Sequence, residues 1–584
     1  MTRPACGRRA ACTALVFALL APLSSLAACG GPSLAIGAVQ GDGDRSPYVG
    51  KTVTVEGLLT RDSRRPGGFR GLYLQAAVGD GNPATSDALF VYTRRSAGEP
   101  GQRLRVSGTI KEFHGLTELA SVTALTVCGD HRLPLPEPIT LNPEHWQSDG
   151  AAHSLERLEN MRVRLPAGLV ITDTHNLARY GELTLAPRDP ITPTEYQAPV
   201  PGLADGGDSP STPLLLDDGQ AVRFPSPIPW LADRRLGPDS VRAGDTLPAL
   251  TGLLDFRFGH WRIQPDGTPE PIATNDRPSP PKRPKDATVR VVAMNVENLF
   301  NGDGRGGGFP TPRGADTQRR YQRQQAALVA ALTGPDPDIL ALSELENDGY
   351  GPESAVATLA QALGPDWRMI TTPGQDGSDA IRTVLLYRAD RVQPDGSPRR
   401  LRAGAFAHRG RPPLVQAFRP MNGGRSVQVV AVHFKSKACG HARGADADQG
   451  DGQGCFAHTR SEEARSVLNG LAALPPAPRT LVTGDFNSYT RETPLSVFTE
   501  AGWGNLVARR HPCTPADCRQ YSYRFRGHKG SLDHALASPQ LQPDVRAASI
   551  WTINADEPEG LPSGTPPGPW RSSDHNPLII DLAL

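Results

Sequence analysis

Acidic, amide and imidazole side chains stand at the ends of apolar runs in the second half of the chain. In order they are Asn295, Glu344, His433, Asp485, Asn487, Asp533, Asp574 and His575. Oxygen ligands of this kind suit Mg²⁺ or Mn²⁺, and Ca²⁺ less well. A bound cation can neutralise a phosphate group, and a positioned histidine can contact it or supply a proton. The set therefore predicts metal-assisted cleavage of a phosphodiester bond.

Asp485 and Asn487 stand two positions apart in the segment GDFN, directly after the β-type run TLVT. In an extended backbone, residues two apart point to the same face. The aspartate can orient or deprotonate an attacking water. The amide can bind a phosphate oxygen without adding negative charge. The spacing therefore favours a shared role of the two residues in hydrolysis.

Two histidines belong to the set, one after an apolar run and one after an aspartate. His433 comes after VQVVAV, and His575 comes after Asp574. An imidazolium suits the negative charge of a phosphodiester and can act as an acid, and we expect Asp533 to fix the tautomer of His575. Taken singly, each residue has an ordinary structural explanation as a cap, a turn former or a buried histidine. The functional interpretation depends on the whole set.

These residues need strand ends that meet in space. VRVVAM, DILAL, VQVVAV, TLVT and NPLIIDL are β-type runs, and they alternate with helical stretches such as RRYQRQQAALVAALTG, SAVATLAQALG and SEEARSVLNGLAAL. From residue 288 to 584 this pattern predicts an α+β domain built as a four-layer αββα sandwich. The order of the strands does not follow from the sequence.

The first half of the chain is β-rich. Short alternating runs bounded by Gly, Pro and Asp predict an OB-like β-barrel module over residues 29–135 and a second β-rich module, also a candidate OB-like fold, over 150–275. The Pro-rich segment 276–287 is interpreted as a linker.

The two modules share a local pattern. Gly101, Gly108 and Gly115 in the first module correspond, with a one-residue shift, to Gly244, Gly252 and Gly259 in the second. This similarity favours duplication. Aromatic residues of the first module can stack on nucleic-acid bases, although core packing is the preferred interpretation for most of them. They are Tyr73, Phe90, Tyr92 and Phe113.

The N-terminus predicts export. Arg3, Arg8 and Arg9 precede the apolar stretch ACTALVFALLAPL, and small residues follow, as in a signal peptide over residues 1–28. No later stretch is long enough to span a bilayer. We therefore expect a secreted, extracellular protein. The lipobox-like segment ending at Cys29 leaves a lipid anchor as an alternative, and a periplasmic location is another.

Six cysteines remain after the predicted signal. In an oxidising compartment an even set favours disulfides. We expect the pairs Cys29–Cys128, Cys439–Cys455 and Cys513–Cys518. A lipid on Cys29 would leave Cys128 without a partner, and the absence of CxxC spacing disfavours a zinc site.

The order Asn, Glu, His, Asp-x-Asn, Asp, Asp-His over Thr288–Leu584 resembles the endonuclease/exonuclease/phosphatase superfamily, whose fold is DNase I-like. Segments such as HFKSK, DGQGC and YSYRFRGHKGSLDHAL resemble the ExeM/NucH-type secreted endonucleases of bacteria. So do AIGAVQGDG and TVTVEGLLT in the N-terminal half, where those enzymes carry an OB-like region. The resemblance therefore extends over most of the mature chain.

The resemblance implies a role for each candidate residue. Asn295, Glu344 and Asp574 would bind the metal, which is expected to be Mg²⁺ or Mn²⁺. His433, Asp485, Asn487, Asp533 and His575 would be catalytic, and Arg411 and Lys435 would bind substrate. Asp379 is a candidate substitute for the glutamate that supports the first histidine in relatives. Ca²⁺ is considered at the acidic loop 445–454, which lacks the last glutamate of a helix-loop-helix site.

The net charge of +1 gives no overall basic field, so polyanion binding needs a local patch or a bound cation. The sequence predicts a monomeric, metal-dependent endonuclease that cleaves DNA, with RNA as a second substrate, without strong sequence preference. One alternative is a phosphodiesterase or phosphatase of the same fold that acts on a phospholipid or small phosphorylated substrate. A polyanion-binding protein without catalysis is a third hypothesis.

Overall fold

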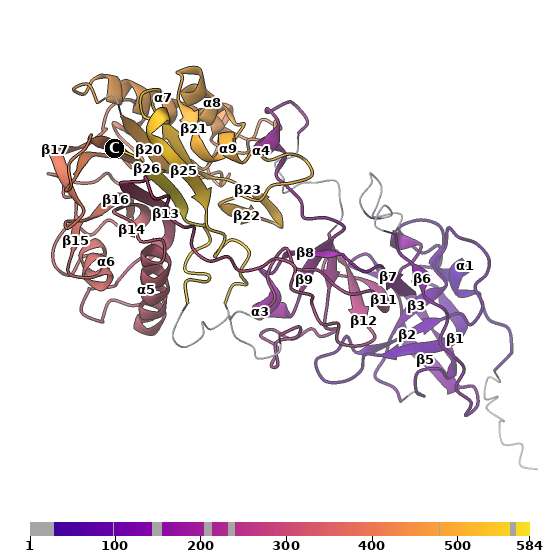
Figure 1. Cartoon of the computed structure of the whole chain (residues 1–584). Coiled ribbons are helices and arrows are strands. Elements are labelled where there is room, and N and C mark those ends of the chain that lie inside the picture. The colour runs from indigo at the N-terminus through magenta and orange to yellow at the C-terminus, as the bar shows by residue number, and fades with distance from the viewer. Residues whose placement is uncertain are drawn as a thin grey trace, which may run out of the picture.

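The computed structural model describes residues 29–96, 98–142, 146, 155–203, 213–231, 240–477, 479–560 and 568–584. The predicted signal peptide, residues 1–28, lies outside them. Three parts follow one another along an elongated molecule, with a barrel at one end and two stacked sheets at the other (Figure 1). None of the helices within these ranges is long and apolar enough to span a bilayer.

The first part is a closed five-stranded barrel in the order β1-β2-β3-β5-β4. Its elements are α1 (Ile36–Gln40), β1 (Thr52–Asp62), β2 (Gly71–Gln75), β3 (Ala88–Tyr92), β4 (Arg103–Phe113) and β5 (Leu116–Val127). Successive side chains of a strand point to opposite faces. Leu72 and Leu74 of β2 and Leu89 and Val91 of β3 accordingly fill the interior.

The second part is a seven-stranded sheet in the order β6-β7-β11-β12-β10-β9-β8. Its elements are β6 (Ile139–Thr140), β7 (Arg162–Leu165), β8 (Val170–Asp173), α3 (Leu177–Tyr180), β9 (Leu183–Ala186), α4 (Pro193–Tyr196), β10 (Leu214–Leu216), β11 (Leu250–Arg257) and β12 (His260–Pro265). The sheet starts before residue 150, the boundary expected from the sequence, because β6 pairs in parallel with β7.

The Gly pattern shared by the two modules corresponds to two similar hairpins. His114 and Gly115 join β4 to β5, with φ of 53° and 88°, and Phe258 and Gly259 join β11 to β12, with φ of 54° and 79°. Two-residue turns with positive φ at both positions match the twist of the flanking strands. The similarity of the hairpins supports the duplication hypothesis.

The third part contains two six-stranded sheets. The first, in the order β15-β16-β14-β13-β26-β25, has the elements β13 (Val289–Leu299), β14 (Ile339–Glu346), β15 (Trp367–Met369), β16 (Ile381–Arg388), β25 (Val545–Ile550) and β26 (Leu578–Leu582). The second, in the order β17-β18-β19-β20-β24-β21, has β17 (Val392–Arg400), β18 (Leu414–Pro420), β19 (Val427–His433), β20 (Thr480–Asp485), β21 (Gly504–Asn505) and β24 (Asp533–Ala537).

The inner faces of the two sheets share one core, in which Val291 and Ala293 of β13 lie with Val429 of β19 and Leu481 of β20. Helices α5 (Gln318–Thr333) and α6 (Ala355–Leu363) share a core with the outer face of the first sheet. Helices α7 (Ala457–Ala472) and α8 (Thr493–Glu500) do so with the second, and α9 (Leu506–Arg510) packs on β24 and β25. Strands covered on both faces explain the continuous apolar runs in the sequence.

The register of the strands brings the candidate residues together. The parallel strands β13 and β14 end beside each other, with Asn295 opposite Ser343, the residue before Glu344. In the second sheet, the parallel pair β19–β20 sets His433 opposite Asp485, which in turn lies opposite Asp533 of β24. Packing of the two sheets then brings both groups of strand ends to one edge.

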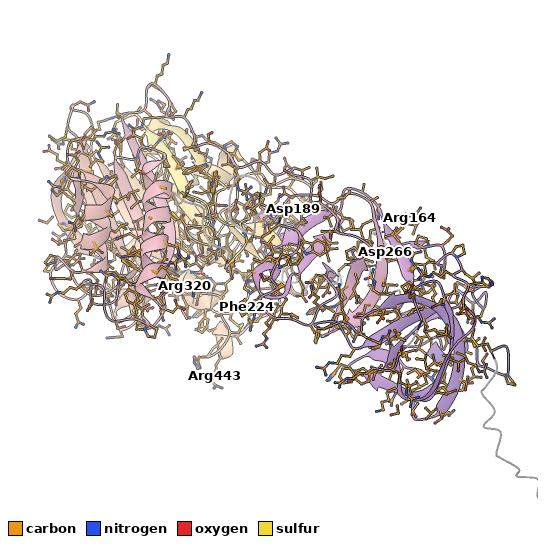
Figure 2. All side chains as sticks on the ribbon, turned by 90° about the horizontal axis from the view of Figure 1, so that it is seen from below. Arg164, Asp189, Phe224, Asp266, Arg320 and Arg443 are labelled. Atoms are coloured by element: carbon orange, nitrogen blue, oxygen red, sulfur yellow. A yellow bond between two sulfur atoms is a disulfide. The ribbon has the colours of Figure 1, made fainter. Side chains whose placement is uncertain are left out.

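The three parts are joined by charged contacts. Asp266 of the second part pairs with Arg61 of the barrel at 3.0 Å, and Asp189 pairs with Arg524 of the third part at 2.6 Å. The two aspartates are labelled at the two junctions in Figure 2. The predicted linker 276–287 has neither helix nor strand, but Arg277 pairs with Glu557 at 2.7 Å. The linker is therefore held against the third part.

The structure contains the disulfides Cys29–Cys128, Cys439–Cys455 and Cys513–Cys518, with sequence separations of 99, 16 and 5. We expect reduction to destabilise the protein, and Cys29–Cys128 to contribute most. A cross-link that closes about 100 residues stabilises by about 4.7 kcal/mol in the chain-entropy model, against about 3 kcal/mol for about 15 residues. Calorimetric unfolding with and without a phosphine reductant measures the effect. An unchanged profile, or free thiols at Cys439 and Cys455 in exported protein, would contradict the expectation.

Candidate functional site

The strand ends of the two sheets open into a cleft of about 1000 Å³. Nine of the sequence-predicted residues line it: Asn295, Glu344, Arg411, His433, Lys435, Asp485, Asn487, Asp574 and His575. The tenth, Asp533, is buried directly behind His575. Residues spread over almost 300 positions of sequence, from Asn295 to His575, thus meet in one place.

His575 is held by a carboxylate and an aromatic ring. Its Nδ1 lies 2.6 Å from Oδ2 of Asp533, and its ring lies 4.6 Å from that of Tyr523 at 33°. Burial alone would lower the pKa of His575, but Asp533 and Asp574 raise it well above its usual value. Because Asp533 occupies Nδ1, Nε2 is the ring nitrogen left for a substrate.

His433 faces two carboxylates. Its Nε2 lies 3.7 Å from Glu344 Oε1 and 3.5 Å from Asp485 Oδ2. Burial lowers the pKa of His433 well below its usual value, and Arg411 and His575 add to the effect. Within the described part of the chain, the buried Nδ1 of His433 has no hydrogen-bond partner. Among the described residues, no carboxylate therefore accepts from Nδ1 of His433 in the way that Asp533 contacts Nδ1 of His575.

The expectation that Asp379 supports His433 is wrong. Asp379 pairs instead with Arg411 at 3.1 Å and with Arg313 at 3.2 Å, because two guanidinium groups attract its carboxylate. Arg411 also donates to the carbonyl oxygens of His433, at 3.1 Å, and Phe434. Arg411 is thus a buried part of the cleft wall that fixes the end of β19.

Asp485 sits at the centre of a hydrogen-bond network. It accepts from the Asn487 amide N–H at 2.7 Å, from Asn295 Nδ2 at 3.1 Å and from Asn487 Nδ2 at 3.3 Å. Burial raises the pKa of Asp485 to about 7. The preceding Gly484 has φ 135°, and a Cβ there would collide with the Val432 carbonyl oxygen. Glycine therefore lets the strand end carry Asp485 close to β19.

The oxygen donors predicted to bind a metal lie beside Asp485 and His433, because Asn295 donates to Asp485 and Glu344 faces His433. Glu344 Oε2 accepts from the Asn298 amide at 3.0 Å, and Asn295 Oδ1 accepts from the Glu297 amide at 3.0 Å. Burial and the nearby Asp574 raise the pKa of Glu344. Two carboxylates that repel each other beside an amide fit a hard divalent cation such as Mg²⁺ or Mn²⁺. Asn295, Glu344 and Asp574 are thus a fitting donor set.

The order and geometry of these residues agree with a known family. Residues 295–575 match the model of the Endonuclease/Exonuclease/phosphatase family. This match extends over most of the third part, which is called the EEP domain below. Members of this family use divalent metal ions and act on phosphate or phosphodiester bonds.

Several solved structures match about half of the chain at low sequence identity. An endonuclease/exonuclease/phosphatase from Bacteroides vulgatus is 16% identical, with 51% of this chain and 98% of that chain covered and a TM-score of 0.35. The Bacteroides thetaiotaomicron mannosyl-6-phosphatase Bt3783 is 15% identical, with 51% of this chain and 100% of that chain covered and a TM-score of 0.35. D. rerio TDP2 complexed with a single-strand DNA product is 13% identical, with 50% of this chain and 98% of that chain covered and a TM-score of 0.33. No curated protein matches the chain.

The two lysines after His433 differ in the EEP domain. Lys435 Nζ lies 4.3 Å from the centre of the Phe456 ring, and burial and Arg411 lower the pKa of Lys435. Lys437 donates to Glu492 Oε1 and to the Gln453 carbonyl oxygen, both at 2.6 Å. Lys435 thus remains a candidate substrate ligand, whereas Lys437 serves the packing of the cleft wall.

The acidic loop 445–454 of the EEP domain uses its carboxylates in hydrogen bonds within the loop and to the first turn of α7. Asp446 accepts from Thr459, Asp448 accepts from the Gly450 amide, and Asp451 accepts from Gln453. These bonds explain the acidic residues as turn formers of the loop. Its resemblance to a calcium loop therefore does not extend to converging carboxylates.

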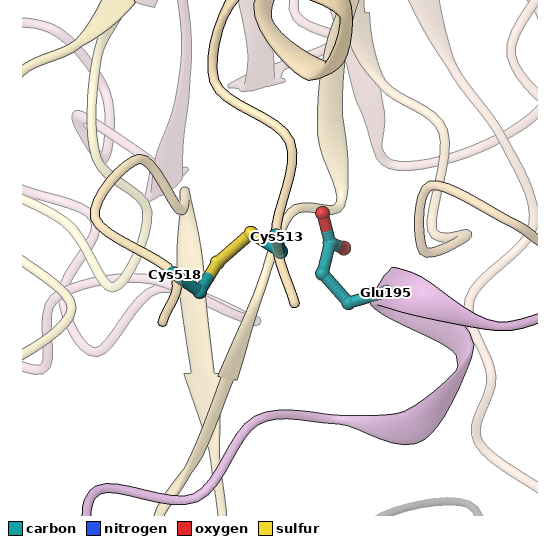
Figure 3. A group of neighbouring side chains, drawn as sticks. All are labelled: Glu195, Cys513 and Cys518. Carbon is teal, nitrogen blue, oxygen red and sulfur yellow. A yellow bond between two sulfur atoms is a disulfide. The ribbon is translucent and has the colours of Figure 1, made fainter. Parts of the chain in front are cut away.

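One further cluster has metal-like spacing. Among the described His, Cys, Asp and Glu residues, Glu195, Cys513 and Cys518 are the only group of three whose ligand atoms lie within 4.8 Å of one another. Figure 3 shows Glu195 beside the disulfide between the two cysteines. Disulfide sulfurs are not thiolates, and Glu195 already accepts from Thr490 Oγ1 at 2.6 Å and from the Ser531 amide at 3.0 Å. The cluster is thus a junction between the second part and the EEP domain.

A hairpin within the segment YSYRFRGHKGSLDHAL, to which the sequence assigned a resemblance but no role, also borders the cleft. It consists of β22 (Tyr523–Phe525) and β23 (His528–Gly530), and its Phe525 and Arg526 line the cleft. Arg524 is buried between Asp189 of the second part, at 2.6 Å, and Asp556, at 2.9 Å. The only signal in the sequence is the alternation of Tyr, Phe and Arg before a glycine. The second part thus holds the hairpin that sets Tyr523 against His575.

Proposed function

We propose that the protein is a secreted, metal-dependent endonuclease of the ExeM/NucH type that hydrolyses phosphodiester bonds of DNA, with RNA as a second substrate and without strong sequence preference. The observation that carries the proposal is the cleft itself. The His575–Asp533 pair, the buried Asp485 and the donors Glu344 and Asp574 converge there. Groups that act on opposite sides of a phosphorus atom must meet in this way.

In the mechanism that we propose, Asp485 orients the attacking water, because its carboxylate is fixed by Asn487 and Asn295. His575 Nε2 contacts a phosphate oxygen and assists the leaving oxygen, with Asp533 holding the ring. His433 Nε2 contacts the phosphate between Glu344 and Asp485. Asn295, Glu344 and Asp574 would hold a Mg²⁺ or Mn²⁺ ion, which when bound supplies positive charge to the phosphate.

The walls of the cleft favour a polyanion over a small substrate. Lys435, Arg409 and Arg526 line the cleft, and Arg526 follows Phe525 at the turn of the hairpin. Within the described residues, none of these three cations makes an ion pair with a carboxylate. Cations along a cleft offer contacts to successive phosphates of one strand. A small phosphorylated molecule would leave most of them without a ligand.

The test uses supercoiled plasmid incubated with Mg²⁺ and, in parallel, with EDTA. We expect relaxed and then linear forms with Mg²⁺ and an unchanged plasmid with EDTA. Sphingomyelin and a small phosphodiester serve as competing substrates in the same buffer. An intact plasmid together with cleavage of either competitor would replace the nuclease by the phospholipid or small-substrate alternative.

We also propose an OB-like barrel, a second module derived from a similar barrel and a four-layer sandwich for the EEP domain. The barrel order β1-β2-β3-β5-β4 and the helix-sheet-sheet-helix layers support these proposals. We propose export by the segment 1–28 and a monomer in solution. The Cys29–Cys128 disulfide supports a free N-terminus rather than a lipid anchor. Intact mass of the mature protein distinguishes the two.

We expect Glu344→Gln to weaken binding of the divalent cation. A ligand that binds only the folded state raises the unfolding temperature, by an amount that depends on its concentration relative to Kd. Mn²⁺ should therefore raise the melting temperature of the wild type much more than that of the variant. Glu462→Gln, at a half-buried position of α7 where the side chain pairs with Arg465, is the control. Equal shifts in the wild type and Glu344→Gln would remove Glu344 from the donor set.

We expect Asp189→Ala to lower plasmid cleavage about tenfold, although Asp189 lies outside the EEP domain. The change removes one of the two carboxylates around the buried Arg524, and removal of one partner of a buried pair is destabilising. The loosened hairpin then releases Tyr523 from His575. Asp366→Ala, at an exposed position, controls for loss of a carboxylate. Wild-type rates in Asp189→Ala would show that the second part does not brace the cleft.

A further inference from the structure

We propose that the barrel carries a binding groove for single-stranded polynucleotide on the outer face of β3, β4 and β5, separate from the cleft of the EEP domain. The groove has a volume of about 820 Å³. The residues that the argument uses are Tyr92, Phe113, Arg94, Arg95 and Lys111. The proposal deepens the proposed function, because the same polymer would occupy the groove and the cleft.

The pleat of the strands decides which residues face outward. Leu89 and Val91 of β3 and Ile110 of β4 lie in the core of the barrel. Side chains alternate along a strand, so Tyr92 and Lys111, next to Val91 and Ile110, belong to the outer face. Phe113, two positions after Lys111, belongs there as well. Aromatic and cationic side chains thus share the outside of neighbouring strands.

The second part of the chain covers one portion of this outer face. Phe90 and Tyr73 lie 4.9 Å apart and form a buried cluster with Leu253 of β11. Tyr73 also donates to Asp255 of β11 at 3.0 Å. Neither of these rings is available to a nucleic-acid base. The core-packing interpretation is therefore right for Tyr73 and Phe90.

The portion beyond that cluster is open. The side chains of Tyr92 and Phe113 are 40% and 55% exposed. Arg94, Arg95 and Lys111 are exposed, and none of the three makes an ion pair with another described residue. Among the described lining residues the one acid is Glu118, which is buried and lies opposite Lys111 in the register. The groove is therefore aromatic and cationic.

This combination recognises a strand whose bases are free. Aromatic rings stack on unpaired bases, and cations contact the phosphates between them. In a duplex the bases already stack on one another, so Tyr92 and Phe113 gain little from it. A single strand offers both kinds of contact at once.

The barrel, whose residues line the groove, and the EEP domain, whose residues line the cleft, lie at opposite ends of the molecule (Figure 1). A short oligonucleotide therefore occupies one of them at a time. A long strand that is bound in the groove raises the effective concentration of its remaining phosphodiesters at the cleft. The expected consequence is that long single strands are cut at lower concentrations than short ones.

The binding test uses the full mature protein and a fluorescein-labelled oligo-dT of about 30 nucleotides, which exceeds the roughly 4–16 nucleotides that one such barrel covers. Anisotropy is measured in EDTA, so that no cleavage occurs. We expect Tyr92→Ala/Phe113→Ala to raise Kd at least about tenfold, since each stacked base contributes about 1–3 kcal/mol. Phe224→Ala, which removes another exposed ring, should leave Kd unchanged.

Two further arms examine the chemistry of the groove. Lys111→Glu should weaken binding and reduce its dependence on salt, whereas Lys51→Glu, at an exposed position of the same barrel, should do neither. A duplex of equal length should lose no affinity in Tyr92→Ala/Phe113→Ala. Unchanged affinity for oligo-dT, or an equal loss for the duplex, would overturn the proposal. The melting temperatures of the variants show that the barrel is folded.

Failure of the groove and failure of the proposed function are distinguishable. If the wild type cuts no nucleic acid, the proposed function is wrong. The anisotropy measurement in EDTA still shows whether the groove binds a single strand. If the wild type cuts plasmid and the double variant binds oligo-dT as tightly as the wild type does, the proposal of a binding groove is wrong and the proposal of a nuclease is retained. With both correct, the double variant cuts a substrate of about four nucleotides at the wild-type rate and a long strand more slowly.

Discussion

We expect His575→Ala to lower the rate of plasmid cleavage by about 10³-fold or more, while the fold remains intact. The ring is held on one side by Asp533 at 2.6 Å and on the other by Tyr523. A positioned acid or base contributes typically about 10²–10⁴-fold, and contact with the phosphate adds electrostatic stabilisation of the transition state. Single-turnover cleavage under Mg²⁺ saturation measures the effect.

His511→Ala is the matched control, because His511 is exposed on the same domain outside the cleft. Asp533→Asn separates orientation from presence of the ring, since the amide keeps the shape of the carboxylate but does not fix the same tautomer. We expect this variant to lose most of the activity that His575→Ala loses. Global unfolding of His575→Ala by circular dichroism, or cleavage within a few-fold of the wild type, would contradict the role of His575.

The sequence identified the residues of the cleft because each of them directly follows or precedes an apolar run. Such runs predict strands, and functional groups of stacked sheets gather at strand ends. The strand register, which sets His433 opposite Asp485 and Asp485 opposite Asp533, could not be predicted from the sequence. Register depends on strand order, and strand order depends on packing over long separations. The residue types and the pair His575–Asp533 were therefore predictable, whereas the neighbours of His433 and Asp485 across the strands were not.

The partner of Asp379 illustrates what local sequence cannot supply. Its carboxylate lies near the strand that relatives use to support the first histidine. Arg313 and Arg411, at separations of 66 and 32 residues, reach it instead. Which cation or imidazole a carboxylate meets depends on side chains from distant segments. When a single residue matches a family pattern, the match therefore predicts where the acidic side chain lies better than it predicts which side chain it contacts.

The hairpin at Tyr523–Gly530 was missed for a related reason. Its sequence alternates aromatic and basic residues, which by itself is typical of many exposed turns. Its position at the cleft depends on Asp189, which is 335 residues away from Arg524. The N-terminal half of the chain thus contributes to the site through a buried ion pair, without lining the cleft.

We expect Asp485→Asn to lower cleavage by about 10³-fold or more, because an amide cannot accept the proton of the attacking water. Asn keeps the size of the side chain and can still accept the Asn487 amide hydrogen bond, so the fold should persist. Asp544→Asn is the control, since Asp544 is a buried carboxylate of the same domain that pairs with Arg425 and Arg479. That change should cost stability and leave the rate per folded molecule unchanged.

The double variant Asp485→Asn/His575→Ala decides whether the two residues act in one step. If the aspartate directs the water while the histidine assists the leaving oxygen, each change disables the same in-line displacement. The losses are then far from additive, and the double variant is only slightly slower than either single variant. If the losses in activation free energy add, so that the two fold-reductions multiply, the two groups act independently of each other. Independent roles would separate Asp485 from the displacement, even though it shares the cleft with His575.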